Sequence, residues 1–550
     1  MRYLVIAGLA ISAALAFSPK GSFRYQSTAF LFEDDYDLLF DPARIPLIEG
    51  SRVYTNLSNF ISNQEEHFSA RTEDYLLIGG STDLIAYIYP GFVLDKYCSK
   101  EALPTGLFGQ TMFDTLKGDA RTVETDWLDI DNNGTYDHRV TRVNEKKAWN
   151  DSTDIDYYFG IGYKVNDLRL GLSFLNTNSS FTFTNPYYNW LYDRRDSSLI
   201  SNALTYTVND TFSGPDKYKT DSKRFIISGW YEFETFSIGL MTGINPISRD
   251  SNYVHTGSSF ENRSPANPLV QDYMKTTMVD SFNKPWTGTN FPIGLSIFAY
   301  PMENMESRFY LNFFTRQEEL GSDAASQQHN TMDSTGQPGY AHLDAQTWHK
   351  YRGGLSNKGI NFSTKQLFEV SERFDLGFGL ELGAWDWQDS LVDTMWSLRV
   401  YEYNNGDTIS GVEDYRVTTT SSDEWVKRVS GVKKLFSIPV GFDFKLVPSL
   451  SLRLGAIHSI TWTDITTTGR LSAFEPVFTR TEYGDSTFFE RVGPQSELQA
   501  TSETINTIEH NTYFTYGAGF NPIKNLQIDI MGFRNLTNLS NWKLSVTFKF

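Results

Sequence analysis

Apolar and polar residues alternate strictly along the last nine residues of the chain. Trp542, Leu544, Val546, Phe548 and Phe550 are apolar, and the residues between them are polar. A period of two places the two sets on opposite faces of a β-strand. One face of this terminal strand is therefore expected to meet an apolar environment, and the other to meet water.

The same alternation recurs upstream in pairs of segments that are separated by short turns. It is clearest in residues 374–382, 436–446 and 450–454. An opening strand near 51–60, the paired segments and the terminal strand together predict about 16 strands. Fourteen strands remain an alternative, because the periodicity is weakest near 51–60 and just after Asp74. The turns of the predicted hairpins lie near Ser81, Asn166, Glu234, Asn304, Glu372, Pro448 and Ile523.

Strand length and connection length both favour a barrel that crosses a membrane. Each predicted strand has about ten residues, the length that a tilted strand needs to span a bilayer. Turns within the pairs are short, whereas the links between pairs are long and polar. These links are residues 99–154, 176–222, 245–290, 317–357, 389–432 and 464–510. We therefore predict an all-β fold, a transmembrane antiparallel β-barrel with long extracellular loops. A water-soluble β-sandwich would not sort its connections in this way.

The N-terminus has the features of a secretory signal peptide. Arg2 precedes an apolar stretch, and Ala14-Leu15-Ala16 supplies a small-x-small cleavage site. A retained anchor is the alternative. The predicted organisation is a signal peptide over 1–16, a periplasmic or plug-like segment over 17–50, and the barrel over 51–550.

Composition narrows the function classes. Aromatic residues make up 15% of the chain, yet the mean hydropathy is −0.37, which does not fit a helical membrane protein. The net charge of −18 speaks against nucleic-acid binding. Cys98 is the single cysteine, so an internal disulfide is excluded. Aromatic residues near the predicted strand ends indicate interfacial girdles, with Trp385, Trp387 and Trp462 on the long-loop side and Tyr300 and Phe374 near the short turns.

Two stretches resemble known outer-membrane proteins. The terminal strand ending in Phe550 resembles the C-terminal signal that directs such barrels to the barrel-assembly machinery. Residues 36–43, which include Asp41, Pro42 and Ala43, resemble the Asn-Pro-Ala region of the long-chain fatty-acid transporter (FadL-type) family, with Asp41 in place of Asn. The resemblance implies an N-terminal segment that plugs the barrel and a hydrophobic substrate that leaves sideways. That family has 14 strands, fewer than the number predicted here.

Residues 129–137 have a calcium-loop spacing. Asp129, Asp131, Asn133 and Asp137 place oxygen ligands at positions 1, 3, 5 and 9 around a glycine at position 6. The twelfth position is Val140 instead of the usual glutamate, so any site would be incomplete. An ordinary Asp/Asn/Gly turn is the competing interpretation.

Charged residues at polar positions of the alternating segments are expected to point into the lumen, because charge facing lipid is costly. A wet lumen and a lumen filled by paired side chains are both consistent with them. These residues are Arg169, Glu232, Asp375, Glu381, Asp443, Lys445, Arg453 and Asp529. The acidic residues of 33–37 are expected to be a solvated segment or, alternatively, a docking site for a periplasmic partner.

The leading prediction is passive transport of a hydrophobic or small solute across the outer membrane of a Gram-negative bacterium, with outer-membrane lipids around the barrel. The alternative is a non-transport barrel that serves a secretion system or binds partners at the surface. An outer-membrane enzyme ranks third, because no catalytic motif is found. No cofactor other than the Ca²⁺ of 129–137 is predicted, and the sequence does not identify the substrate.

Overall fold

The computed structural model describes residues 21–58, 71–83, 87–103, 118–201, 203–265, 272–336, 339–406, 414–484, 486–492, 500–533 and 543–550. The predicted signal peptide and Trp542 lie outside these residues. Within them, no helix is long and apolar enough to cross a membrane.

Three short helices precede the strands: α2 (Phe23–Ser27), α3 (Asp35–Leu38) and the 3-10 helix η1 (Pro42–Leu47). The strands of the first half are β1 (Arg52–Ser58), β2 (Arg71–Ser81), β3 (Ile88–Ala102), β4 (Gly118–Leu128), β5 (His138–Val165), β6 (Leu168–Thr184), β7 (Trp190–Ser198), β8 (Leu204–Ser213), β9 (Asp216–Glu232) and β10 (Phe236–Asn262). Those of the second half are β11 (Tyr273–Met302), β12 (Met305–Leu320), β13 (Ala325–Gly336), β14 (Gly339–Ser371), β15 (Phe374–Asn404), β16 (Tyr415–Val447), β17 (Leu450–Tyr483), β18 (Thr487–Val492), β19 (Thr501–Ile523), β20 (Leu526–Phe533) and β21 (Lys543–Lys549).

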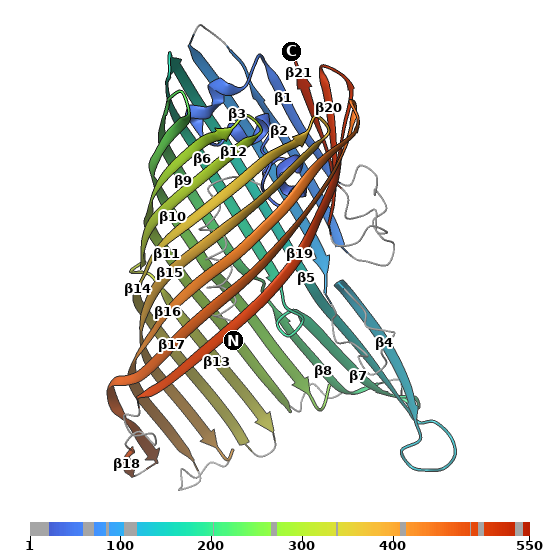
Figure 1. Ribbon diagram of the computed structural model, residues 1–550. Helices are drawn as coiled ribbons and strands as arrows, with labels where there is room; N and C mark the ends of the chain where they lie inside the picture. The colour runs from blue at the N-terminus through green and yellow to red at the C-terminus, as the bar shows by residue number, and fades with distance from the viewer. Residues whose placement is uncertain are drawn as a thin grey trace.

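The strands form an antiparallel barrel whose ring contains 16 strands, as predicted (Figure 1). Strand β21 pairs with β1 and closes the ring. The closure reaches the last residue, since the amide of Phe550 donates to the carbonyl of Ser51 at 3.0 Å. Every short hairpin turn falls within a few residues of its predicted position. The first ring strand begins, and the last ring strand ends, on the side of the short turns. The ring strands are β1, β2, β3, β5, β6, β9, β10, β11, β12, β14, β15, β16, β17, β19, β20 and β21.

The other five strands continue ring strands beyond a local break. Strand β13 pairs with β11 and β14, the same two neighbours that flank β12. In the same way β4 continues the line of β3 along β5, and β7 continues that of β6. Strand β8 extends the line of β9 along β10, and β18 that of β19 along β17. These strands therefore lengthen the wall of the barrel and add no position to the ring.

The long polar links are thus mostly strand, and the expectation of long loops is wrong for the described residues. Strand β14 has 33 residues, which at about 3.3 Å per residue corresponds to roughly 110 Å. A transmembrane strand needs only about ten residues. The sheet therefore continues far beyond any bilayer on the side opposite the short turns (Figure 1).

The outward face of the barrel changes character along each strand. On β11 the outward residues nearest the short turn are Ile297, Leu295, Ile293 and Phe291, and those that follow are threonine, proline, asparagine and serine. Exposed apolar side chains of the other strands gather at the same end. We call this end, which also holds the N-terminal helices, the inner section, and the polar remainder the outer section.

The predicted aromatic girdle is only partly confirmed. Trp462 is exposed on the outward face and Tyr300 lines the interior at the short-turn end, but Trp385 and Trp387 are buried. Their positions match the inward alternation of Gly377 and Gly379 on β15. Sequence proximity to a strand end therefore did not determine the facing of these two residues, whereas the strand period did.

Candidate functional site at the plugged end of the barrel

Residues 21–50 form a plug inside the inner section, in agreement with the layout implied by the FadL-type resemblance. Helix η1 contacts β3, β5, β6 and β9, whereas α2 contacts β17, β19 and β20. Leu31, Leu39 and Ile45 of the plug are fully buried. They pack on wall residues such as Tyr158 and Leu367, so apolar contact supplies part of the binding energy.

Inward-facing glycines bring the wall close enough to touch the plug backbone. A Cβ at Gly171 would lie 2.2 Å from the carbonyl carbon of Pro42, and one at Gly162 would lie 2.6 Å from the carbonyl oxygen of Pro42. Across the barrel, a Cβ at Gly441 would lie 2.4 Å from the carbonyl oxygen of Thr28. These positions exclude any side chain while the plug stays where it is.

The Asp-Pro-Ala motif fixes η1 to strand β9. One carboxylate oxygen of Asp41 accepts the amide of Ala43 at 3.2 Å and caps the helix, and the other accepts Trp230 Nε1 at 2.6 Å. The Ala43 amide also lies 2.9 Å from the Ser228 hydroxyl. Because both oxygens of Asp41 act as acceptors, an asparagine could make only one of the two bonds.

Glu33 is the centre of an ion-pair cluster between plug and wall. Its carboxylate lies 2.7 Å from a guanidinium nitrogen of Arg44 and 2.7 Å from one of Arg308 on β12. Arg308 also pairs with Glu306 at 2.8 Å. Burial alone would raise the pKa of Glu33, but the adjacent guanidinium groups hold that pKa well below its ordinary value. Glu33 therefore stays ionised in the docked plug.

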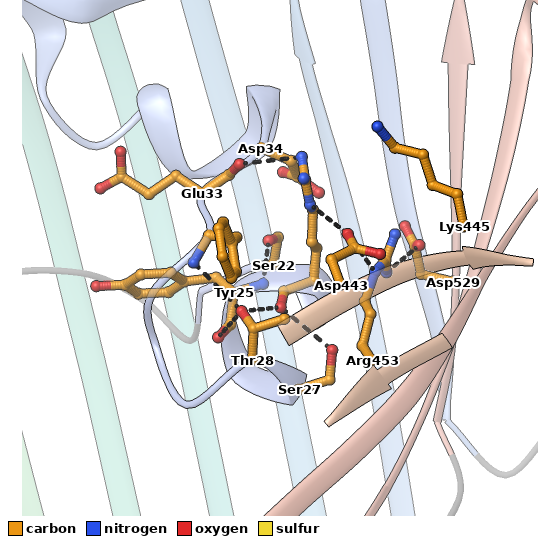
Figure 2. A network of polar contacts seen from close by, with 12 residues as sticks. Ser22, Tyr25, Ser27, Thr28, Glu33, Asp34, Asp443, Lys445, Arg453 and Asp529 are labelled. Carbon is orange, nitrogen blue, oxygen red and sulfur yellow. Dashed lines mark hydrogen bonds and ion pairs between the residues drawn. The ribbon is translucent and has the colours of Figure 1, made fainter. Parts of the chain in front are cut away.

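A second cluster fixes α2 to strands β16, β17 and β20 (Figure 2). Arg24 of the plug and Arg453 of β17 both pair with Asp443 of β16, at 3.1 and 3.3 Å. Arg453 also pairs with Asp529 of β20 at 2.5 Å. Asp443 and Asp529 are each only 2% exposed, so their charges depend on these partners.

The structure places the eight predicted lumen residues as follows. Arg169 is buried, pairs with Glu232 and lies over the ring of Trp230. Asp375 and Asp443 are cross-strand neighbours, and Lys445 is two residues beyond Asp443. Glu381 lies apart from these groups and accepts Asn361 Nδ2 at 2.8 Å. The structure thus brings Asp443, Arg453 and Asp529 together, which strand spacing alone did not indicate.

The acidic segment 33–37 is not the freely solvated segment that was expected, because its side chains are partly buried and paired inside the barrel. Asp37 accepts the amide and the hydroxyl of Ser22 at 2.7 and 2.6 Å, and also the amide of Asp34 at 2.9 Å. Burial raises the pKa of Asp37 to about 6, although these bonds oppose the shift. Burial and the neighbouring Asp37 also raise the pKa of Asp34. Asp35 pairs with Arg52 at 2.8 Å at the start of β1.

A charged vestibule of about 520 Å³ lies between the plug and the short-turn mouth. Arg44, Arg308 and Glu306 line it on one side, and Asp443, Lys445 and Arg453 line it on the other. Thr547 and Lys549 of the terminal strand also reach it, while Phe548 and Phe550 are exposed. Leu544 and Val546 share the alternation of Phe548, so the apolar side of β21 faces outward.

The predicted calcium loop lies at the far end of the outer section, between β4 and β5. Carboxylate oxygens of Asp129, Asp131 and Asp137 lie within 4.8 Å of one another. They accept backbone amides of the same turn, including that of Asn133. Val140 is buried within β5 and offers no ligand. The geometry is that of a turn stabilised by Asp and Asn side chains, and it leaves Ca²⁺ binding as a prediction.

Sequence reasoning missed the residues that hold the plug. Arg308 follows the inward alternation of Tyr310 and Asn312 on β12, so its facing was available from the period. Its partner Glu33 is 275 positions away, and no local pattern connects the two. Trp230 was likewise recognisable as an inward residue of β9, but its bond to Asp41 was not.

The fold and the plug together define the class: the chain is a plugged 16-stranded β-barrel of the outer-membrane type. No family model and no curated protein matches it. Among solved structures, it is similar to the toluene transporter TodX of Pseudomonas putida, with 10% identity over 97% of this chain and 99% of that chain and a TM-score of 0.33. A TodX mutant described as a monoaromatic hydrocarbon channel gives 11% identity, 96% and 99% coverage and a TM-score of 0.34.

A mutant of the ferric enterobactin receptor PfeA from Pseudomonas aeruginosa gives 9% identity over 91% of this chain and 81% of that chain, with a TM-score of 0.27. Identities and TM-scores this low do not assign a function by themselves. The function is therefore inferred from the residues of this chain.

Proposed function

We propose that the protein is a gated transport barrel of the Gram-negative outer membrane that admits a hydrophobic or small solute. The observation that supports it most is the plug, which docks through backbone contacts with wall glycines and through ion pairs with β12 and β16. A segment held in this way can leave without breaking a covalent bond or unfolding the wall.

The same proposal includes the surroundings of the barrel. The apolar outward face of the inner section suits outer-membrane lipids. The apolar positions of β21 up to Phe550 suit recognition by the barrel-assembly machinery. The names of the solved structures given above, a hydrocarbon channel and a siderophore receptor, agree with transport of small molecules.

Conductance across a planar lipid bilayer tests the proposal. We expect low current from the full barrel and a large, steady current from a variant without residues 17–50. A staple supplies the control. Ser27→Cys and Gly517→Cys, in a Cys98→Ser background, join plug and wall where the two Cβ positions lie 2.9 Å apart. To form a disulfide the backbones must separate by about 0.6 Å, and the Ile530 carbonyl, 2.7 Å from the new Cβ, must also shift. Oxidation should abolish residual current, and reduction should restore it.

A barrel without residues 17–50 that is correctly folded but carries no current would contradict the proposal. The result would favour the second candidate, a surface-interaction barrel. The observation in favour of that candidate is the outer section, whose long polar strands present a large wall to the outside. Binding of externally added partners would then depend on the outer section and would not change when the plug is removed.

A further inference from the structure

The Glu33 cluster has the composition of a binding site for an organic carboxylate. Two guanidinium groups, those of Arg44 and Arg308, converge on one carboxylate, which is the arrangement by which proteins hold carboxylate ligands. Both guanidinium groups also lie over the ring of Phe298, at 5.0 and 4.9 Å from its centroid. The carboxylate in this site belongs to the protein's own plug.

The cluster holds three cations, of which two have direct ion pairs. Arg44 and Arg308 pair with Glu33, and Arg308 pairs also with Glu306. Lys365 donates to the Tyr25 hydroxyl at 2.8 Å and lies over the Tyr25 ring, and no carboxylate of the described residues pairs with it. The buried Arg44 Nε has no hydrogen-bond partner in the same part of the chain. Lys365, which Asp37 faces without a direct ion pair, and the Arg44 Nε are therefore the groups that an additional or competing anion could engage.

The vestibule gives access to the site from the short-turn end of the barrel. Arg44, Arg308, Glu33 and Phe298 all line the vestibule of about 520 Å³ at the short-turn end. Trp230 and the exposed Tyr300 line it as well, so flat apolar surfaces lie beside the charged groups. The Glu33 side chain points away from the Asp443–Arg453 cluster (Figure 2), whereas its backbone carbonyl accepts a hydrogen bond from Arg24 at 3.5 Å, so the two clusters are linked through the plug.

We propose that Arg44 and Arg308 form a carboxylate site that Glu33 occupies while the plug is docked, and that a small aromatic carboxylate from the short-turn side competes with Glu33 and loosens the plug. This inference rests on the gated transport proposed above. It adds a ligand class and a direction of control: the gate is released from the periplasmic side. The aromatic ring of the ligand would contact Tyr300, Phe298 and Trp230.

Calorimetry on the purified full-length barrel, with benzoate as the probe, tests the site without measuring transport. Benzamide has the same shape without the charge, and acetate has the charge without the ring. We expect benzoate to bind and both controls to bind at least about tenfold more weakly, since a charge-assisted hydrogen bond contributes about that factor. Equal binding of benzoate and acetate would overturn the aromatic part of the proposal, and equal binding of benzamide would overturn the carboxylate part.

Two variants test the competition itself. Glu33→Gln removes the internal competitor and should tighten benzoate binding about tenfold, whereas a merely structural Glu33 would leave it unchanged or weaken it. Arg308→Met should abolish binding. Arg263→Met, which removes an exposed arginine of the outer section, is the matched control and should bind as the wild type does. Unchanged affinity in Glu33→Gln would refute the competition.

Conductance then separates this inference from the transport proposal. Benzoate added on the short-turn side should raise the current of the wild type and leave the variant without residues 17–50 unaffected. If that variant conducts but benzoate fails to bind the wild type, transport stands and the carboxylate site fails. If benzoate competes with Glu33 while the variant without residues 17–50 carries no current, the site stands and the transport proposal fails.

Discussion

The inner and outer sections of the barrel share one wall but meet different surroundings. In the inner section outward residues are apolar and inward residues contact a plug through glycines and buried ion pairs. In the outer section both faces carry polar residues, and some ion pairs, such as Arg263–Glu261, are exposed, whereas the group centred on Glu318 is buried. The comparison teaches that backbone pairing carries the sheet through both sections, while side-chain composition decides where it meets lipid, plug or water.

The largest expected effect comes from the buried charges of the inner section. Arg453→Met leaves Asp443 and Asp529 with one fewer cation, and breaking such a buried network costs about 3–5 kcal/mol. Arg263→Met breaks an exposed pair of the outer section and should cost less than about 1 kcal/mol. Urea unfolding in lipid vesicles measures both. Equal losses would mean that the burial of these two ion pairs does not set their contribution to stability.

The next test places the same charge at two outward positions of β11 that have different surroundings. Ile293→Arg places a charge in the apolar belt of β11 and should cost about 2–4 kcal/mol in lipid. Val279→Arg lies on the same strand and the same face with similar exposure, 41% against 46%, but in the outer section. It should change stability by no more than about 0.5 kcal/mol. Heat-modifiability on gels after insertion into vesicles measures folding of both variants. A damaging effect of Val279→Arg would show that the apolar belt extends as far as Val279.

Glycine substitution tests plug packing without charge. Gly171→Ala places a methyl group against the backbone of Pro42, and overpacking of this kind costs about 1–3 kcal/mol. The strain falls on the docked plug, so limited proteolysis should cleave residues 21–50 faster while the barrel stays folded. Gly229→Ala, whose Cβ would have 3.3 Å to its nearest neighbour, is the control. Protection of the plug in both variants would argue against close contact at Gly171.

A smaller effect should follow pH. The pKa of Asp37 is raised to about 6 in the docked plug, above the ordinary value of 3.8, so docking favours the protonated form. This contribution is fully present below about pH 4 and is lost as the pH rises through 6. Glu33 stays ionised across this window, because its pKa is lowered. The plug of the wild type should therefore resist protease better at pH 5 than at pH 7.5. Asp37→Asn should reduce that difference, and an unchanged difference would assign it to another group.

The smallest effect concerns the outer tip. If residues 129–137 bind Ca²⁺, the ion should protect this turn from protease, and a chelator should remove the protection. Asp129→Asn should weaken the response, while Asp119→Asn on the neighbouring β4 serves as the control. A cleavage rate that is the same with and without chelator would contradict Ca²⁺ binding and favour the ordinary turn. The protease resistance of the plug and the conductance should not change when Ca²⁺ is added or removed.

The inner section was largely predictable from sequence and the outer section was not, for one physical reason. A strand between lipid and water shows period two, so 436–446 and 450–454 were located closely. Strand β13 has water-suited residues on both faces, so its sequence has no period and was interpreted as part of a loop. Strand β13 forms because its backbone pairs with β11 and β14. Backbone pairing does not depend on the side chains, so the residue pattern does not reveal it.

The candidate site was predictable only in part. Strand period gave the facing of Asp443 and Arg453, and the family resemblance gave the plug. The acidic residues of 33–37 were interpreted as solvated because their partners, Arg308 among them, lie far away in sequence. Burial of a charge depends on the other side of the barrel, which local sequence does not describe.

The closure of the ring by the last strand has a consequence for the order of folding. Residue Ser27 contacts Thr515, Arg24 contacts Asp443, and the residue after the plug pairs with Phe550. Contacts between such distant residues form late, because closing long loops costs entropy. The plug is the first described part of the chain to be synthesised, yet its contacts extend to β20, near the other end of the chain. A docked plug is thus a record that the barrel was completed.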